Sequence, residues 1–160
     1  MRSLGAAART DALVYLTGGA TAVLLGWRET TIDVDIAAVV PESDELLRAL
    51  PRLKDELQIN VELASPADFI PMTVGWEDRS LFIGREGRLT YYNLDPYSQA
   101  LAKLERAHAQ DLEDVGAMLE RELVDPKRAL RLYEEIESQL YRFPAVDVAS
   151  FRRRVERALG

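Results

Sequence analysis

The chain contains no cysteine, and it has only one histidine, His108, among its 160 residues. Without cysteine it can form neither a disulfide bond nor a thiolate zinc site, which fits a reducing compartment such as the cytoplasm. A single histidine also excludes a multi-histidine metal centre. We expect His108 to be a surface residue of a helix.

Long hydrophobic runs are also missing. No apolar stretch of the sequence reaches the length needed to span a bilayer. The first residues do not form the apolar stretch of a signal peptide, because Arg9 and Asp11 interrupt it. We therefore expect a cytoplasmic protein without a membrane partner.

The chain has fewer basic than acidic residues: 20 lysines and arginines against 27 aspartates and glutamates, which gives a net charge of −7. Proteins that bind long nucleic acids through their phosphates are usually basic, so extended DNA is not an expected partner. A small nucleotide, a structured RNA end or a protein partner remain open, because clustered arginines can act locally. The clusters are Arg79, Arg85 and Arg88, and then Arg152, Arg153, Arg154 and Arg157.

The order of predicted elements indicates an α+β fold. Strands are predicted at 12–17, 31–39 and 58–64, with a hairpin at 81–84 and 88–93. Helices are predicted at 3–11, 19–26 and 44–56, and after Pro96 at 96–109, 111–122, 126–141 and 147–159. The chain is 48% hydrophobic, enough for one sizeable core. We predict an α/β core at 1–95 and a helical region at 96–160 packed on it as one compact unit.

The segment from Tyr15 to Ile36 carries the clearest chemical signal. Asp33 and Asp35 alternate with Val34 and Ile36, so on a strand both carboxylates share one face while the apolar residues enter a core. Two like charges held so close repel each other unless a cation is present. This pair predicts a divalent metal site, with Mg²⁺ (or Mn²⁺) as the cofactor if phosphates are the substrate.

A glycine pair precedes the aspartates. Gly18 and Gly19 end an apolar run and begin a short helix, where exposed backbone and free N–H groups favour a phosphate. The hydroxyl groups of Thr17 and Thr21 flank this loop and are further candidates for phosphate contacts. A metal site beside a phosphate loop predicts a nucleotide site, with an NTP as the partner.

These residues resemble a known family. The glycine pair, a spacer and the alternating aspartates are similar to the signature of the polymerase-β-type nucleotidyltransferase superfamily, with a long spacer from Ala20 to Ile32. The run Arg28–Asp35 resembles the R-x-x-T-x-D-[IV]-D form of small bacterial members, which include the AbiEii-like toxin nucleotidyltransferases. The stretch Lys103–Asp114 resembles the K-x-x-R…D-x-x-D helical motif of the same group.

The resemblance implies a small mixed sheet with flanking helices and a helical C-terminal half. It also implies metal-dependent transfer of an NMP group from an NTP to a hydroxyl of an RNA end, such as tRNA, or of a protein. The chain would then be the toxin or modifying part of a toxin–antitoxin system, with a cognate antitoxin or toxin as partner. The residues implied for nucleotide binding beyond the glycine loop are Arg28, Lys103 and Arg106, with Asp111 and Asp114 completing the second motif.

Two assignments keep alternatives open. The resemblance implies Glu62 as a third catalytic carboxylate, although many relatives carry aspartate there; as a plain surface residue it would leave a non-catalytic module that binds a nucleotide or a partner. Lys103 would be a point charge on the triphosphate, and the alternative is the solvated side of an ordinary helix. In either case we expect an exposed lysine whose truncation hardly affects folding.

Overall fold

The computed structural model describes all 160 residues, which form two compact units. The first contains Met1–Ser65 and Ser80–Leu94, and the second contains Pro66–Arg79 and Asp95–Gly160. The chain passes from the first unit to the second for the last time between Leu94 and Asp95. Residues 66–79, which lie within the predicted core range 1–95, belong to the second unit with the C-terminal helices.

The first unit is built on one mixed sheet of five strands in the order β3-β2-β1-β5-β4. β1 pairs antiparallel with β2 and parallel with β5, while β3 runs parallel to β2 and β4 antiparallel to β5. The strands are β1 (Ala12–Thr17), β2 (Asp33–Val40), β3 (Asn60–Leu63), β4 (Leu81–Glu86) and β5 (Leu89–Asn93). Together with the helices this sheet confirms the predicted α+β class.

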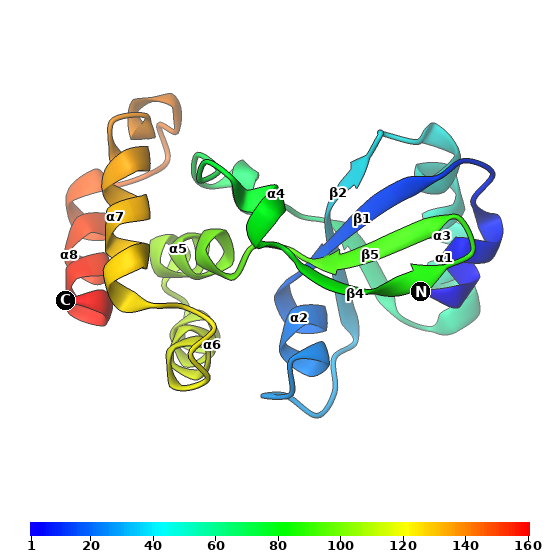
Figure 1. Ribbon diagram of the computed structural model, residues 1–160, viewed down its shortest axis with the longest axis horizontal. Coiled ribbons are helices and arrows are strands. Elements are labelled where there is room, and N and C mark those ends of the chain that lie inside the picture. The colour runs from blue at the N-terminus through cyan, green and yellow to red at the C-terminus, as the bar shows by residue number, and fades with distance from the viewer. The chain divides into compact units, whose positions relative to one another are not determined.

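Helices cover one face of this sheet. α1 (Arg2–Ala7) and α3 (Asp44–Leu57) pack together on it, and α2 (Gly18–Leu24) contacts β1 and β2 (Figure 1). Ser43 begins α3 by accepting a hydrogen bond from the Leu46 backbone N–H at 3.4 Å, which satisfies one of the free donors of the first turn. Every second strand residue enters the core, including Val14, Leu16, Ile36, Val61, Leu89 and Tyr91.

β3 departs from the expected alternation at its end. Val61 is buried, but Leu63, which by strand alternation should point inward as well, is 58% exposed. β3 is the edge strand of the sheet and ends at this residue, so no neighbouring element covers the leucine.

The second unit is helical and has α5 at its centre. α5 contacts α4, α6, α7 and α8, and is buried from Pro96 to Leu104. The helices are α4 (Trp76–Arg79), which we did not predict, α5 (Pro96–Arg106), α6 (Ala109–Glu120), α7 (Pro126–Glu137) and α8 (Val148–Leu159), with 3₁₀ turns at Pro66–Asp68 and Leu140–Arg142. None of the helices is both long and apolar enough to cross a membrane.

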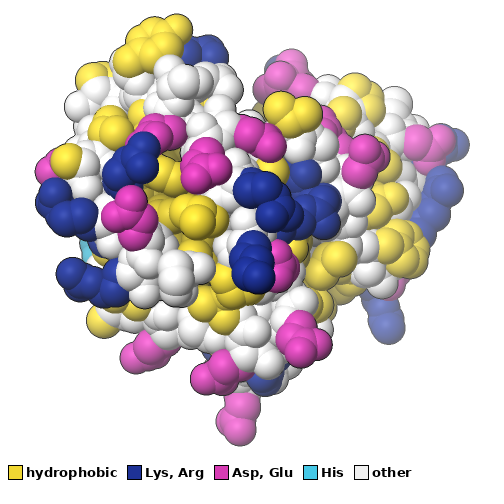
Figure 2. All heavy atoms as spheres, turned by 60° about the vertical axis from the view of Figure 1, so that its left-hand side comes forward, with side chains coloured by type: hydrophobic (Ala, Val, Ile, Leu, Met, Phe, Trp, Pro, Cys, Tyr) yellow, Lys and Arg dark blue, Asp and Glu magenta, His cyan; other side chains and the backbone are white.

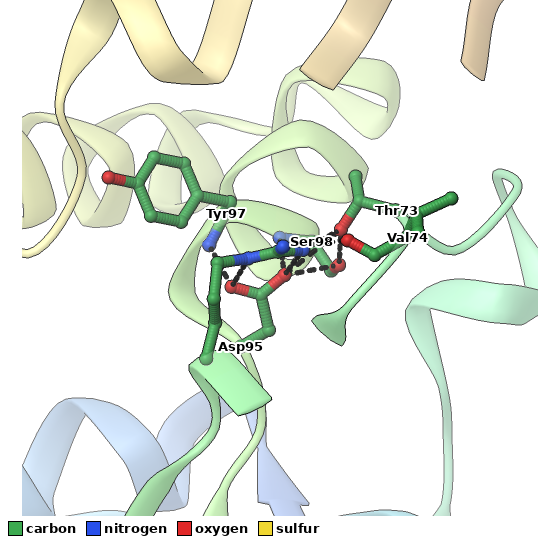
Figure 3. Close-up of polar contacts among 6 residues, drawn as sticks. Thr73, Val74, Asp95, Tyr97 and Ser98 are labelled. Atoms are coloured by element: carbon green, nitrogen blue, oxygen red, sulfur yellow. Dashed lines mark hydrogen bonds and ion pairs between the residues drawn. The ribbon is translucent and has the colours of Figure 1, made fainter. Parts of the chain in front are cut away.

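A buried carboxylate ties residues 66–79 to α5. Asp95 is fully buried and caps α5 by accepting hydrogen bonds from the backbone N–H groups of Tyr97 and Ser98. It also accepts from the hydroxyls of Ser98 at 2.8 Å and Thr73 at 3.0 Å (Figure 3). Arg79 donates to both carboxylate oxygens, at 3.1 and 2.9 Å. This network explains why residues 66–79 belong to the helical unit.

Candidate active site

The β1–α2 loop lies directly against the aspartate strand, and two glycines make this possible. Gly18 has a φ of +62°, and a Cβ atom there would lie 2.1 Å from Asp35 Oδ2. A Cβ atom on Gly19 would lie 2.4 Å from the Thr31 hydroxyl oxygen. Only glycine tolerates both the left-handed conformation and this close approach. The predicted phosphate loop and the predicted metal pair are therefore neighbours in the structure.

The third carboxylate lies on the same face as the pair. β2 and β3 run parallel with Asp33 opposite Asn60 and Asp35 opposite Glu62. Facing residues of neighbouring strands project to the same side of a sheet, so Glu62 stands beside Asp35 and not on the far face. The structure thus places the three predicted acids on one face of the sheet, while their catalytic roles remain predictions.

Asn60 joins these acids, and the sequence reasoning did not assign it to the site. Its side-chain amide donates to Asp33 Oδ1 at 3.2 Å and to Glu62 Oε1 at 2.8 Å. An amide that donates to two carboxylates holds both in place without adding charge. The signal was present in the sequence, because Asn60 and Glu62 alternate on β3 as Asp33 and Asp35 do on β2.

The hydroxyl groups near the loop have structural partners. Thr31 donates to the Asp33 carbonyl at 2.9 Å and accepts from the Asp33 N–H at 3.1 Å, which fixes the start of β2. Thr21 is fully buried and donates to the Leu16 carbonyl at 3.4 Å, so its hydroxyl is turned toward β1. Thr17 is buried at the N-terminal cap of α2, and Arg28 is half-buried in the loop before β2. Their contacts with a nucleotide remain predictions.

The donor set suits a magnesium ion that shares its coordination with phosphates. The oxygens of Asp33 and Asp35 are the hard ligands that Mg²⁺ prefers, and Mg²⁺ is commonly bound by one or two carboxylates plus substrate phosphates. No three acidic or histidine side chains converge as a complete metal cage. Gly18 has no side chain that would press against the Asp35 carboxylate. These residues therefore fit the cation that the sequence predicts.

The second motif forms a buried ion cluster in the helical unit. Lys103 is only 6% exposed, and its ammonium contacts Asp114 at 2.7 Å and Asp111 at 3.2 Å. Arg106 donates to both oxygens of Asp111, and its guanidinium lies 5.1 Å from the centre of the Phe69 ring. The expectation of an exposed lysine was wrong. The four residues do come together as a motif, but their contact with a nucleotide remains a prediction.

The burial of Lys103 changes the expected effect of its removal. Lys103→Met would remove the ammonium that pairs with the buried Asp111 and Asp114, and breaking such a buried ion pair costs about 3 kcal/mol of the free energy of unfolding. Urea denaturation measures this loss. The exposed Lys127 on α7 provides the control, because Lys127→Met should change stability by less than about 0.5 kcal/mol. Equal midpoints for the two variants would contradict the structural role of Lys103.

Comparison with known proteins identifies the class. The family described as "Nucleotidyltransferase of unknown function (DUF6036)" matches residues 2–156. The chain belongs to this nucleotidyltransferase family. No curated protein and no solved structure matches it. Because the match spans both units, the sheet with its aspartates and the helices with the Lys103 cluster are parts of one family pattern.

Membership in this family confirms the predicted relationship to minimal nucleotidyltransferases. The class follows from the match, and the structure adds that the glycine loop, Asp33 and Asp35 of this nucleotidyltransferase are neighbours. A closer relationship to the AbiEii-like toxins remains a prediction, as do the metal, the substrates and any toxin role.

Proposed function

We propose that this nucleotidyltransferase is an active enzyme that moves a nucleoside monophosphate from an NTP to a hydroxyl group, with Asp33 and Asp35 holding Mg²⁺ or Mn²⁺. The observation that carries the proposal is the packing of Gly18 on Asp35, where a Cβ atom would fall 2.1 Å from the carboxylate oxygen. A loop that only had to turn would not need to approach a carboxylate so closely.

In this proposal each residue of the site has a separate role. The backbone of Gly18 and Gly19, at the N-terminus of α2, receives the β- and γ-phosphates. Asp33 and Asp35 hold the cation, and Asn60 keeps Asp33 and Glu62 oriented. When bound, the cation neutralises charge on the phosphates and favours deprotonation of the attacking hydroxyl.

The transfer forms one bond and breaks another. The acceptor oxygen bonds to the α-phosphorus, and the bond from that phosphorus to the bridging β-oxygen breaks. Pyrophosphate leaves with the electron pair of the broken bond. The proton of the acceptor hydroxyl passes to Glu62 or to water, because Glu62 stands beside Asp35 on the same face.

The proposed acceptor is either an RNA end or a protein. We also propose that the enzyme acts as the toxin or modifying part of a toxin–antitoxin system. The net charge of −7 argues against a long nucleic acid. Figure 2 shows both basic and acidic side chains on the surface.

A second candidate is a module that binds a nucleotide or a partner without catalysing transfer. One observation favours it, because no third acidic side chain converges with the aspartate pair into a metal cage. Glu62 is exposed and accepts a hydrogen bond from Asn60, an arrangement that also suits a structural role. The two candidates differ in whether pyrophosphate is released.

The deciding experiment incubates the protein with each of the four NTPs and Mg²⁺, and follows pyrophosphate release together with labelling of RNA or protein. We expect one or more NTPs to give pyrophosphate and a labelled acceptor, and chelation of the metal to stop both. Binding of an NTP without pyrophosphate or label, across a broad set of acceptors, would support the non-catalytic module instead.

A further inference from the structure

Three aromatic side chains form a row across the sheet on the face that carries Asp35. Tyr15 on β1 is paired with Tyr92 on β5, which is paired with Phe82 on β4. The rings of Tyr15 and Tyr92 stack with their centres 5.4 Å apart, and Phe82 meets Tyr92 edge-on at 5.8 Å. Thr17 pairs with Asp35, and Tyr15 lies two residues before Thr17, so the row and the carboxylate share one face.

The outer end of this aromatic row is exposed. Phe82 is 65% exposed and Tyr92 is half-buried, while Tyr15 is buried and stacks on Tyr92 from the neighbouring strand. Bases of single-stranded nucleic acids stack on aromatic side chains in this way, including those on the open sheets of RNA-binding domains.

Beyond the aromatic row lies a hollow with two arginines. Its volume is about 390 Å³, and its lining includes Leu13, Thr90, Arg85 and Arg88. The Arg85 and Arg88 side chains are 60% and 57% exposed, and both pair with the exposed Asp11, at 3.0 and 3.7 Å. Exposed ion pairs are weak, so these cations can exchange Asp11 for phosphates. The hollow lies four residues along β1 from Thr17, or about 13 Å.

The order of these features along β1 places the region for the leaving group and the region for the acceptor at different ends of the site. Gly18 and the phosphate loop lie at one end, Thr17 beside Asp35 comes next, and Tyr15 and Leu13 follow in the opposite direction. In phosphoryl transfer the attacking and leaving oxygens are in line across the phosphorus. Pyrophosphate held by the glycine loop therefore places the attacking hydroxyl on the aromatic side.

We propose that this face binds the acceptor as a single-stranded RNA end, whose bases stack on Tyr92 and Phe82 and whose backbone phosphates reach Arg85 and Arg88. The inference rests on the proposed function and names the acceptor class of the same site. This binding surface is short, because it consists of one aromatic row and two arginines. Its size fits an acidic protein that binds a few nucleotides and not a long strand.

The test measures binding of a six-nucleotide single-stranded RNA that carries 2-aminopurine near its 3′ end, whose fluorescence falls when the base stacks. Phe82→Ala should weaken binding about fivefold to thirtyfold and reduce the quenching, as expected for the loss of one stacked base. Phe82→Trp should restore both. Tyr141 is an aromatic residue that is 81% exposed and lies in the helical unit, so Tyr141→Ala is the matched control and should change neither.

The arginines and the NTP provide independent measurements. Arg88→Gln should lower the salt dependence of RNA binding by about one unit of the log–log slope, because one phosphate contact is lost. NTP binding, titrated in parallel, should be unchanged in Phe82→Ala. Unchanged RNA binding in Phe82→Ala would overturn the proposal, and so would a loss confined to the NTP, because the row would then hold the base of the NTP.

The two proposals fail in different assays. RNA binding and base stacking are measured without an NTP, so they do not depend on catalysis. The loss of the proposed function would appear in the NTP screen, through missing pyrophosphate, whether or not Phe82 binds RNA.

Discussion

Asp35→Asn is expected to lower the rate of nucleotide transfer about 10³-fold, which corresponds to about 4 kcal/mol of transition-state stabilisation. The physical reason is that asparagine keeps the shape of the side chain but loses the negative charge that holds the cation beside the glycine loop. Asp33→Asn should have an effect of similar size. The rate is measured as pyrophosphate release with the NTP that the screen selects.

The same variants should separate metal binding from folding. Mg²⁺ with an NTP should raise the melting temperature of the wild type by mass action, and this rise should vanish in Asp33→Asn and Asp35→Asn. Without ligand the variants should be as stable as the wild type or slightly more stable, since a repulsion between like charges is removed. Asp55→Asn on the exposed side of α3 is the control. If the nucleotide raised the melting temperature of both variants as much as that of the wild type, the metal-site proposal would be wrong.

Asp95→Ala should lower the free energy of unfolding by about 3–5 kcal/mol, the cost of leaving a buried charge without its partner. The carboxylate is fully buried, and the Arg79 side chain that pairs with it is only 13% exposed. The change also removes the cap of α5 and the acceptor for Thr73 and Ser98. Urea denaturation followed by circular dichroism measures the loss.

A second Asp-Pro cap in the same unit gives the matched control. Asp125 caps α7 by accepting from the Arg128 N–H at 2.7 Å, and it is followed by a proline as Asp95 is. Asp125 is exposed, so Asp125→Ala should cost only about 1 kcal/mol, the usual value for a lost cap. If both alanine variants lost the same stability, the Asp95 network would be no more than an ordinary cap.

The aspartate pair shows how far local pattern reaches. The alternation of Asp33 and Asp35 with Val34 and Ile36 determined that the carboxylates share a face, because strand periodicity is a property of the backbone. The glycine pair likewise predicted a tight loop before a helix. Even the place of Glu62 could be expected from alternation on its own strand, and β2–β3 pairing puts it opposite Asp35.

Lys103 shows where local pattern fails. Residues three apart share a helix face whether that face is solvated or buried. The spacing of Lys103 and Arg106 therefore could not distinguish an exposed lysine from a buried one. Burial was decided by α6, which packs against α5 and supplies Asp111 and Asp114. The same holds for residues 66–79, whose place with the helices depends on the contact of Arg79 with Asp95.

The sequence by itself therefore determined the strands, every helix except α4, the α+β class, and the residues of the loop and aspartate pair, because turn chemistry and periodicity are local. Only the tertiary structure decided that Gly18 touches Asp35, that Asn60 bridges two acids, and that Tyr15, Tyr92 and Phe82 form one row. The row joins residues of three strands far apart in the chain, and strand order and register depend on packing of the whole sheet and not on any one segment.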